Sequence, residues 1–161
     1  MRRIIRRREI VEDELRYPGE AEGAGTVLVQ PAAQWLAGSA AAEGPAAVLL
    51  TATDEVESLA QRLQDVRWIV VEFAKIGEGR GYTQARLLRQ RAGYTHELRA
   101  RGALKRDQLV FLARCGFDAF ELDPSEDLTA ALGAFDSFTV AYQDGSDSLV
   151  SLRRRIPTAA A

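Results

Sequence analysis

The segment Trp68-Ile69-Val70-Val71-Glu72-Phe73 is the clearest strand signal in the chain. A short run of β-branched and aromatic residues, bounded by turn signals, is typical of a strand buried on both faces of a parallel sheet. A glycine-rich turn follows this run, and a helix is expected from about Thr83 to Arg91. Together these signals predict a unit of strand, turn and helix.

The same unit recurs along the chain. Strands are expected to begin near residues 27, 46, 68, 95, 118 and 138, with helices over 32–37, 54–64, 83–91, 105–115, 124–135 and 144–155. This rhythm is typical of successive right-handed βαβ units and predicts an α/β fold with a parallel sheet. A complete TIM barrel takes about 250 residues. The chain has 161 residues, so the sheet is expected to be either incomplete TIM-barrel-like or open and doubly wound.

The N-terminus has a different pattern. Ile4-Ile5 and Ile10-Val11 are short apolar pairs separated by charged residues, and Tyr17-Pro18-Gly19 has the composition of a turn. A hairpin-like entry to the same domain is therefore expected. The predicted organisation is a hairpin-like segment over 1–20, a single α/β domain over 21–156 and a frayed tail over 157–161.

The composition excludes several classes of protein. Hydrophobic residues make up 47% and charged residues 27%, which is a globular profile and argues against global disorder. The net charge of −2 gives no overall field toward nucleic acid or membrane, so neither is expected as a partner. The single cysteine, Cys115, cannot form an internal disulfide, and neither a signal peptide nor a membrane-length apolar run is visible. A cytoplasmic location is expected.

Charged residues interrupt several of the expected strands. Glu72 lies near the end of one strand, Glu97 and Arg99 share one face of the next, and Glu121 lies in a third. Burying such charges in a sheet is costly unless they are paired. They are expected either to line a polar cleft or barrel mouth, or to form structural ion pairs on an exposed strand. The candidate catalytic residues are Glu72, Glu97 and Arg99.

The glycine-rich turn between the strand at 68 and the following helix could hold an anion. Its alternate glycines would let the backbone approach a ligand, and Arg80 could clamp a phosphate, sulfate or carboxylate. It matches neither a Walker loop nor the dinucleotide-binding fingerprint. A tight turn with Thr83 as the N-cap would explain it without a ligand. The candidate anion-binding residues are Gly79, Arg80, Gly81, Tyr82, Thr83, Arg86 and Arg89.

No metal site is predicted. His96 is the only histidine and Cys115 the only cysteine, so neither a histidine-rich nor a cysteine-based metal site can be assembled from one chain. His96 is expected at a surface or a strand edge, and Cys115 is expected to be a small buried apolar residue. The residues indicate no particular cofactor.

The central part of the chain carries a distinctive series of short motifs. They are Gly79-Arg80-Gly81-Tyr82-Thr83, Ala85-Arg86-Leu87-Leu88-Arg89, Gly93-Tyr94, Glu97-Leu98-Arg99-Ala100, Gly102, Asp107-Gln108 and Arg114-Cys115-Gly116-Phe117-Asp118-Ala119-Phe120. This series resembles the bacterial family known as domain of unknown function 934. The chain departs from the family pattern at Glu78 and Ala103, where aspartate is usual, and at His96, where glycine is usual.

The resemblance implies a role in sulfite reduction. Members of the family are commonly labelled as a probable oxidoreductase, because their genes lie beside a sulfite or nitrite reductase haemoprotein gene. That association supplies no mechanism. Two functions are therefore considered: an accessory protein of assimilatory sulfite reduction that binds the reductase, and a barrel-like enzyme acting on a small anion. In the enzyme, Arg80 and Arg99 would hold the anion and Glu72 or Glu97 would act as acid or base. Self-association of an incomplete barrel stays open.

Overall fold

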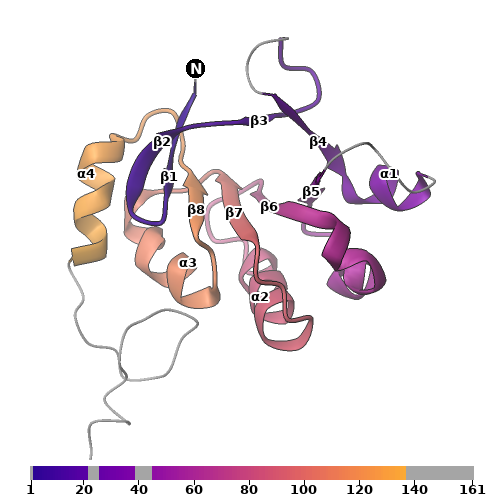
Figure 1. Cartoon of the computed structure of the whole chain (residues 1–161). Helices are drawn as coiled ribbons and strands as arrows, with labels where there is room; N and C mark the ends of the chain where they lie inside the picture. Colours follow the sequence, from indigo (N-terminus) through magenta and orange to yellow (C-terminus); the bar gives the residue numbers. More distant parts are fainter. Residues whose placement is uncertain (1, 22–25, 39–44, 137–161) are drawn as a thin grey trace, which may run out of the picture.

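An eight-stranded sheet forms the centre of the computed structural model, which describes residues 2–21, 26–38 and 45–136 (Figure 1). The strands are β1 (Arg3–Arg6), β2 (Glu9–Glu12), β3 (Leu15–Arg16), β4 (Val27–Pro31), β5 (Ala46–Leu50), β6 (Val66–Phe73), β7 (Glu97–Gly102) and β8 (Ala119–Glu121). Their order is β2-β1-β8-β7-β6-β5-β4-β3. Neighbours from β3 to β8 are parallel, whereas β1 is antiparallel to both β2 and β8.

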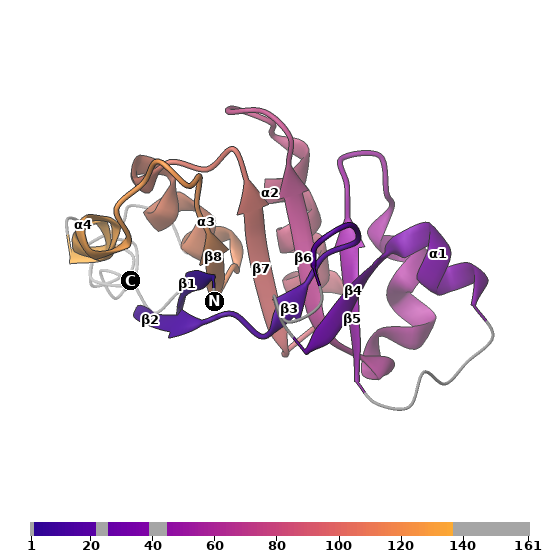
Figure 2. The same ribbon diagram turned by 90° about the horizontal axis from the view of Figure 1, so that it is seen from above.

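The described helices lie on one face of this sheet (Figure 2). They are α1 (Ala32–Ala37), the 3-10 helix η1 (Val56–Asp65), α2 (Arg80–Arg86) continued by η2 (Leu87–Arg91), η3 (Arg106–Gln108) continued by α3 (Leu109–Cys115), and α4 (Leu128–Leu132) continued by η4 (Gly133–Asp136). A doubly wound sheet carries helices on both faces, so that alternative is wrong. The sheet is instead a curled half-barrel with the helices outside it.

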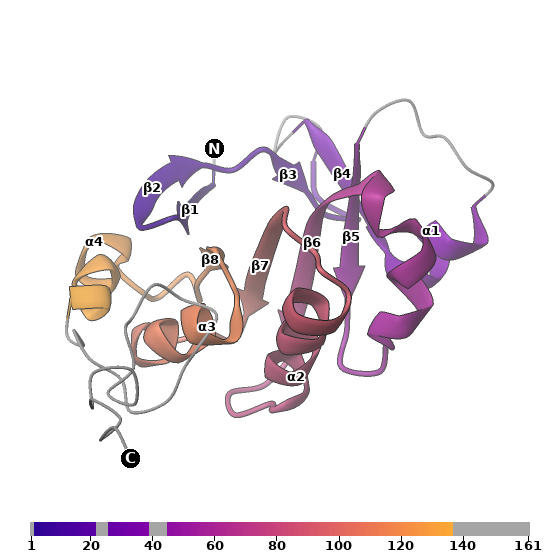
Figure 3. The same cartoon turned by 60° about the horizontal axis from the view of Figure 1, so that its bottom comes forward.

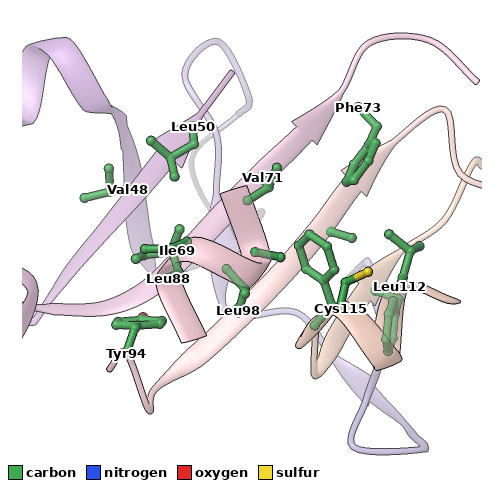
Figure 4. Packing of buried hydrophobic residues seen from close by; sticks show 14 of the residues in the cluster. Val48, Leu50, Ile69, Val71, Phe73, Leu88, Tyr94, Leu98, Leu112 and Cys115 are labelled. Atoms are coloured by element: carbon green, nitrogen blue, oxygen red, sulfur yellow. The ribbon is translucent and has the colours of Figure 1, made fainter. Parts of the chain in front are cut away.

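The alternation of side chains along the strands builds the main core between sheet and helices (Figure 4). Ile69, Val71 and Phe73 of β6 point toward the helices, as do Leu98 and Ala100 of β7. These side chains are almost fully buried against apolar residues of α2 and α3, which explains why the amphipathic helices dock on this face.

The opposite face of the sheet is concave and is covered by the N-terminal segment (Figure 3). β2 and β3 stand at opposite ends of the strand order, yet only Asp13 and Glu14 separate them along the chain. The N-terminal segment therefore bridges the open side of the half-barrel. A second apolar cluster lies beneath it and comprises Leu15, Tyr17, Val29, Ala47, Trp68 and Val70.

Most of the predicted elements are confirmed. Strands occur near 27, 46, 68, 95 and 118, and helical segments separate them, which confirms the α/β class and the parallel pairing. The helix expected over 54–64 is a 3-10 helix with one non-helical residue, Arg62, whose guanidinium lies over the ring of Trp35. The strand near 138, the helix over 144–155 and the tail over 157–161 fall outside the described residues.

Candidate functional site

Arg99, in the middle of β7, is the largest fully buried side chain in the described part of the protein. Because Leu98 and Ala100 face the helices, Arg99 faces the concave side. Its Nη1 donates to Asp13 Oδ1 at 2.7 Å, and its Nη2 and Nε donate to Glu97 Oε1 at 2.9 and 3.1 Å. A guanidinium at this depth is tolerable only because both carboxylates neutralise it.

This ion pair belongs to a larger group at the bottom of the concave face, which we call the Arg99 network: Arg6, Asp13, Glu14, Glu97 and Arg99. Arg6 bridges two of its acids, with Nε 2.8 Å from Glu97 Oε2 and Nη2 2.8 Å from Glu14 Oε1. Burial opposes ionisation of Asp13, but Arg99, the Leu15 N–H and Arg2 together outweigh it and lower the pKa of Asp13. Burial raises the pKa of Glu97 despite Arg99 and Arg6.

A second charged group lies closer to the carboxyl ends of the strands than the Arg99 network does. We call it the Tyr17 layer, and its members are Arg2, Tyr17, Glu20, Arg101 and Glu121. Two guanidinium groups contact the Tyr17 ring, with Arg101 Cζ 3.4 Å and Arg2 Cζ 4.8 Å from the ring centroid. Its hydroxyl donates to Glu121 Oε2 at 2.9 Å. Burial, together with the charge of Glu121, raises the pKa of Tyr17.

A cavity of about 620 Å³ opens beside the Tyr17 layer, at the carboxyl ends of β7 and β8. We call it the Arg101 cavity. Its basic side chains come from β7, β1 and the residue before β1, and its acidic ones come from β8 and the loop before α4. The charged residues lining it are Arg2, Arg3, Arg101, Glu121, Asp123, Glu126 and Asp127.

The structure brings two of the three candidate catalytic residues together. Glu97 and Arg99 are in direct contact, but both are enclosed: the side chain of Arg99 is 0% and that of Glu97 12% exposed. Glu72, on β6, lies on the same concave face of the sheet as Glu97 and Arg99. It is opposite Arg101 in the register and is half-buried. Among the described residues it has no ion-pair partner.

The candidate anion-binding residues separate into several places. Arg80 and Thr83 line a cavity of about 450 Å³ with acidic residues of the loop before η1. Gly81 packs on the ring of Phe73, where a Cβ would clash, and Tyr82 lies edge-on to Phe73 at 5.3 Å between ring centroids. A Cβ on Gly79 would meet open space, and Arg86 is exposed.

Arg89 has a different environment, because it binds backbone at the amino ends of the strands. Its Nε donates to Gly116 O at 2.9 Å, and its Nη1 donates to Tyr94 O at 2.7 Å and His96 O at 2.8 Å. Its Nη2 lies 3.3 Å from Asp118 Oδ2. Arg89 thus joins the chain before β7 to the chain before β8, and it does not lie beside Arg80.

The partners that complete both charged groups were missed by the sequence reasoning. Asp13 and Tyr17 come from the N-terminal segment, for which the sequence predicts only a hairpin and a turn. They contact residues 86 and 104 positions away, respectively. One sequence signal points to such a partner: charged residues alternate along β7. Once β7 is placed inside the sheet, its buried arginine requires an acid from another element.

Neither metal-binding nor membrane-spanning features stand out in the described ranges. No group of three or more histidine, cysteine, aspartate or glutamate side chains there is arranged to hold a metal ion. None of the helices described is both long and apolar enough to cross a bilayer. Cys115 is buried in the main core, and the His96 ring packs edge-on to Tyr94 at the exposed end of β7.

Comparison with known proteins gives one match. Searches of curated proteins and of solved structures found nothing similar. The family described as "Bacterial protein of unknown function (DUF934)" matches residues 47–152, a range that begins in β5 and includes β7 and β8 but not the N-terminal segment. Since the match covers well over half of the sequence, the chain belongs to this family of bacterial proteins, DUF934.

Proposed function

We propose that this protein is an accessory protein of bacterial assimilatory sulfite reduction, acting in the cytoplasm by binding a sulfite or nitrite reductase haemoprotein. The pathway comes from the family resemblance. The accessory role is supported chiefly by one observation: the charged side chains inside the half-barrel bind one another. Arg99 uses all three of its nitrogens on Asp13 and Glu97.

The enzyme alternative needs those same groups to be free. An acid–base residue must come within hydrogen-bond reach of its substrate. Glu97 is held by Arg6 and Arg99, and the N-terminal segment covers both Glu97 and Arg99. Displacing Asp13 would leave the buried guanidinium of Arg99 with one of its two acids, and breaking a buried ion pair costs about 3–5 kcal/mol. We therefore favour binding over turnover at this position.

Two exposed apolar side chains are candidate contacts for the reductase. Ile76, in the loop between β6 and α2, is 65% exposed, and Phe111 on α3 is 58% exposed. The Phe111 ring packs on Tyr82 of α2 at 5.0 Å between centroids, so it is held in place outside the core. Fixed aromatic groups of this kind are common anchors in protein interfaces.

Co-purification with the reductase from the same bacterium tests the proposal. The full chain should retain the reductase on an affinity column, and Phe111→Ser and Ile76→Ser should weaken retention at least tenfold. Leu28→Ser is the matched control, because Leu28 is 44% exposed on β4 at the other end of the sheet. Purified proteins that never associate would overturn the reductase-binding proposal.

A further inference from the structure

Arg101 is the one arginine of the Tyr17 layer whose hydrogen-bonding capacity is mostly unused in the described part of the chain. Each nitrogen of Arg2 has a partner: its Nε binds Asp13 at 2.8 Å, its Nη1 binds Glu20 at 2.6 Å and its Nη2 binds Leu15 O at 2.9 Å. Within the described ranges, the only ion pair of Arg101 joins its Nε to Glu121 Oε1 at 3.3 Å. Neither of its Nη atoms has a partner among the described residues.

The position of Arg101 is nevertheless fixed. Its guanidinium lies 3.4 Å from the centroid of the Tyr17 ring, and Tyr17 is itself held by the hydrogen bond to Glu121. Stacking uses the flat face of a guanidinium and leaves its N–H edge available. A fork held in this way has little rotational freedom to lose when it binds a carboxylate or oxyanion.

The N–H edge of the Arg101 guanidinium lies at the Arg101 cavity. The side chain of Arg101 is 24% exposed, and Arg3 on β1, which is exposed, lines the same cavity. Arg3 likewise has no acidic partner among the described residues. The cavity lies where β7 and β8 end, and open α/β sheets usually bind ligands outside the carboxyl ends of their strands.

Three of the four acidic residues of the cavity contact a cationic group, and the fourth, Asp127, keeps its charge but accepts backbone N–H groups. Lys105 Nζ lies 3.3 Å from Glu126 and 3.9 Å from Asp123. The Oδ1 of Asp127 caps α4 by accepting from Thr129 N. The charge of Glu121 is shared by Arg2, Arg101 and the Tyr17 hydroxyl. The strongest unmet hydrogen-bonding capacity in the cavity is therefore that of Arg101 and Arg3.

From this arrangement we propose that the Arg101 cavity binds a small molecule through a carboxylate or oxyanion group, held by the Nη edge of Arg101 and by Arg3. The acidic wall on the α4 side can also accept a cationic group of the same ligand. This site is independent of reductase binding and differs from the turn around Arg80 that the sequence predicts. It needs none of the residues enclosed in the Arg99 network.

Titration calorimetry and thermal shift on the full chain test the site. The probes are sulfite, sulfate and phosphate in one arm, and zwitterionic amino acids in the other. Saturable binding in either arm supports the site, and the arm that binds distinguishes a free oxyanion from a carboxylate carried beside an ammonium group. No binding in either arm overturns the proposal.

Variants assign the binding to this cavity. Arg101→Gln should weaken it at least tenfold, as expected for the loss of hydrogen bonds to a charged group. Arg3→Gln should weaken binding severalfold. Because Arg3 is exposed, this variant should fold, so it still tests the site if Arg101→Gln does not fold. Arg80→Gln is the matched control and should bind like the wild type. Binding that is lost in Arg80→Gln but kept in Arg3→Gln would contradict the assignment.

Discussion

Gly102 ends β7 with a φ of +118°, in the left-handed region that favours glycine. A Cβ at this position would clash with the carbonyl oxygen of Phe73 in the neighbouring strand. The chain can then turn at the wall of the Arg101 cavity, where Ala103 N donates to Phe73 O at 2.9 Å. The glycine is required by the close approach of two strands.

We expect Gly102→Ala to lower the free energy of unfolding by about 1–3 kcal/mol, because it adds both backbone strain and a clash. Gly79→Ala is the control: its φ is −75° and a Cβ there meets open space, so it should change stability by less than about 0.5 kcal/mol. Urea unfolding of both variants measures the difference. Equal stabilities would show that the strand ends are not packed as described.

Tyr17 is expected to make stability depend on alkaline pH. Its folded-state pKa is raised above the ordinary value of 10.0, chiefly by burial and by Glu121. The folded protein therefore holds the phenol proton more tightly, so the contribution is present below pH 10 and is lost as the pH rises above 10. Urea unfolding at pH 8 and pH 11 should show a smaller alkaline loss in Tyr17→Phe than in the wild type. Identical losses would contradict a buried, neutral Tyr17.

At the level of elements, Arg89 fastens the helix segment η2 to the chain that enters β7 and β8. Arg86 lies one helical turn earlier and is exposed, so the two arginines form a matched pair. Arg89→Ala removes hydrogen bonds to three backbone carbonyls and should cost about 2 kcal/mol or more. Arg86→Ala should cost less than about 0.5 kcal/mol. If chemical unfolding showed equal losses for Arg89→Ala and Arg86→Ala, the backbone contacts of Arg89 would not be stabilising, and Arg89 would again be a candidate for anion binding.

The elements themselves could be predicted from sequence because their signals are local. Apolar runs such as Ile69–Val71 identify strands without tertiary information. Gly116, directly after Cys115, likewise marks the end of α3, where its φ is +114°. The site could be predicted only in part. Glu97 and Arg99 share one face because strands alternate, but the acid that completes Arg99 is 86 residues away and carries no local signal.

At the scale of the whole molecule, the N-terminal segment closes the open side of the half-barrel. It supplies Asp13 and Tyr17 to the two charged groups and Leu15 to the second apolar cluster. Deleting residues 1–20 would expose Arg99 and the concave apolar side chains together. We expect the shortened chain to lose the cooperative unfolding transition of the full chain, measured by circular dichroism. A truncated protein with an unchanged transition would show that the half-barrel is stable alone.

A double-mutant cycle between Asp13 and Arg99 tests most directly whether the interior of the half-barrel is held together by its own charges. Asp13→Leu and Arg99→Met should each lower the free energy of unfolding by about 3–5 kcal/mol, because each takes one partner from a buried charge, leaving Arg99 with Glu97 alone and Asp13 with Arg2 alone. The double variant should lose clearly less than the sum of the two. Single variants within about 1 kcal/mol of the wild type, with additive effects, would contradict the account.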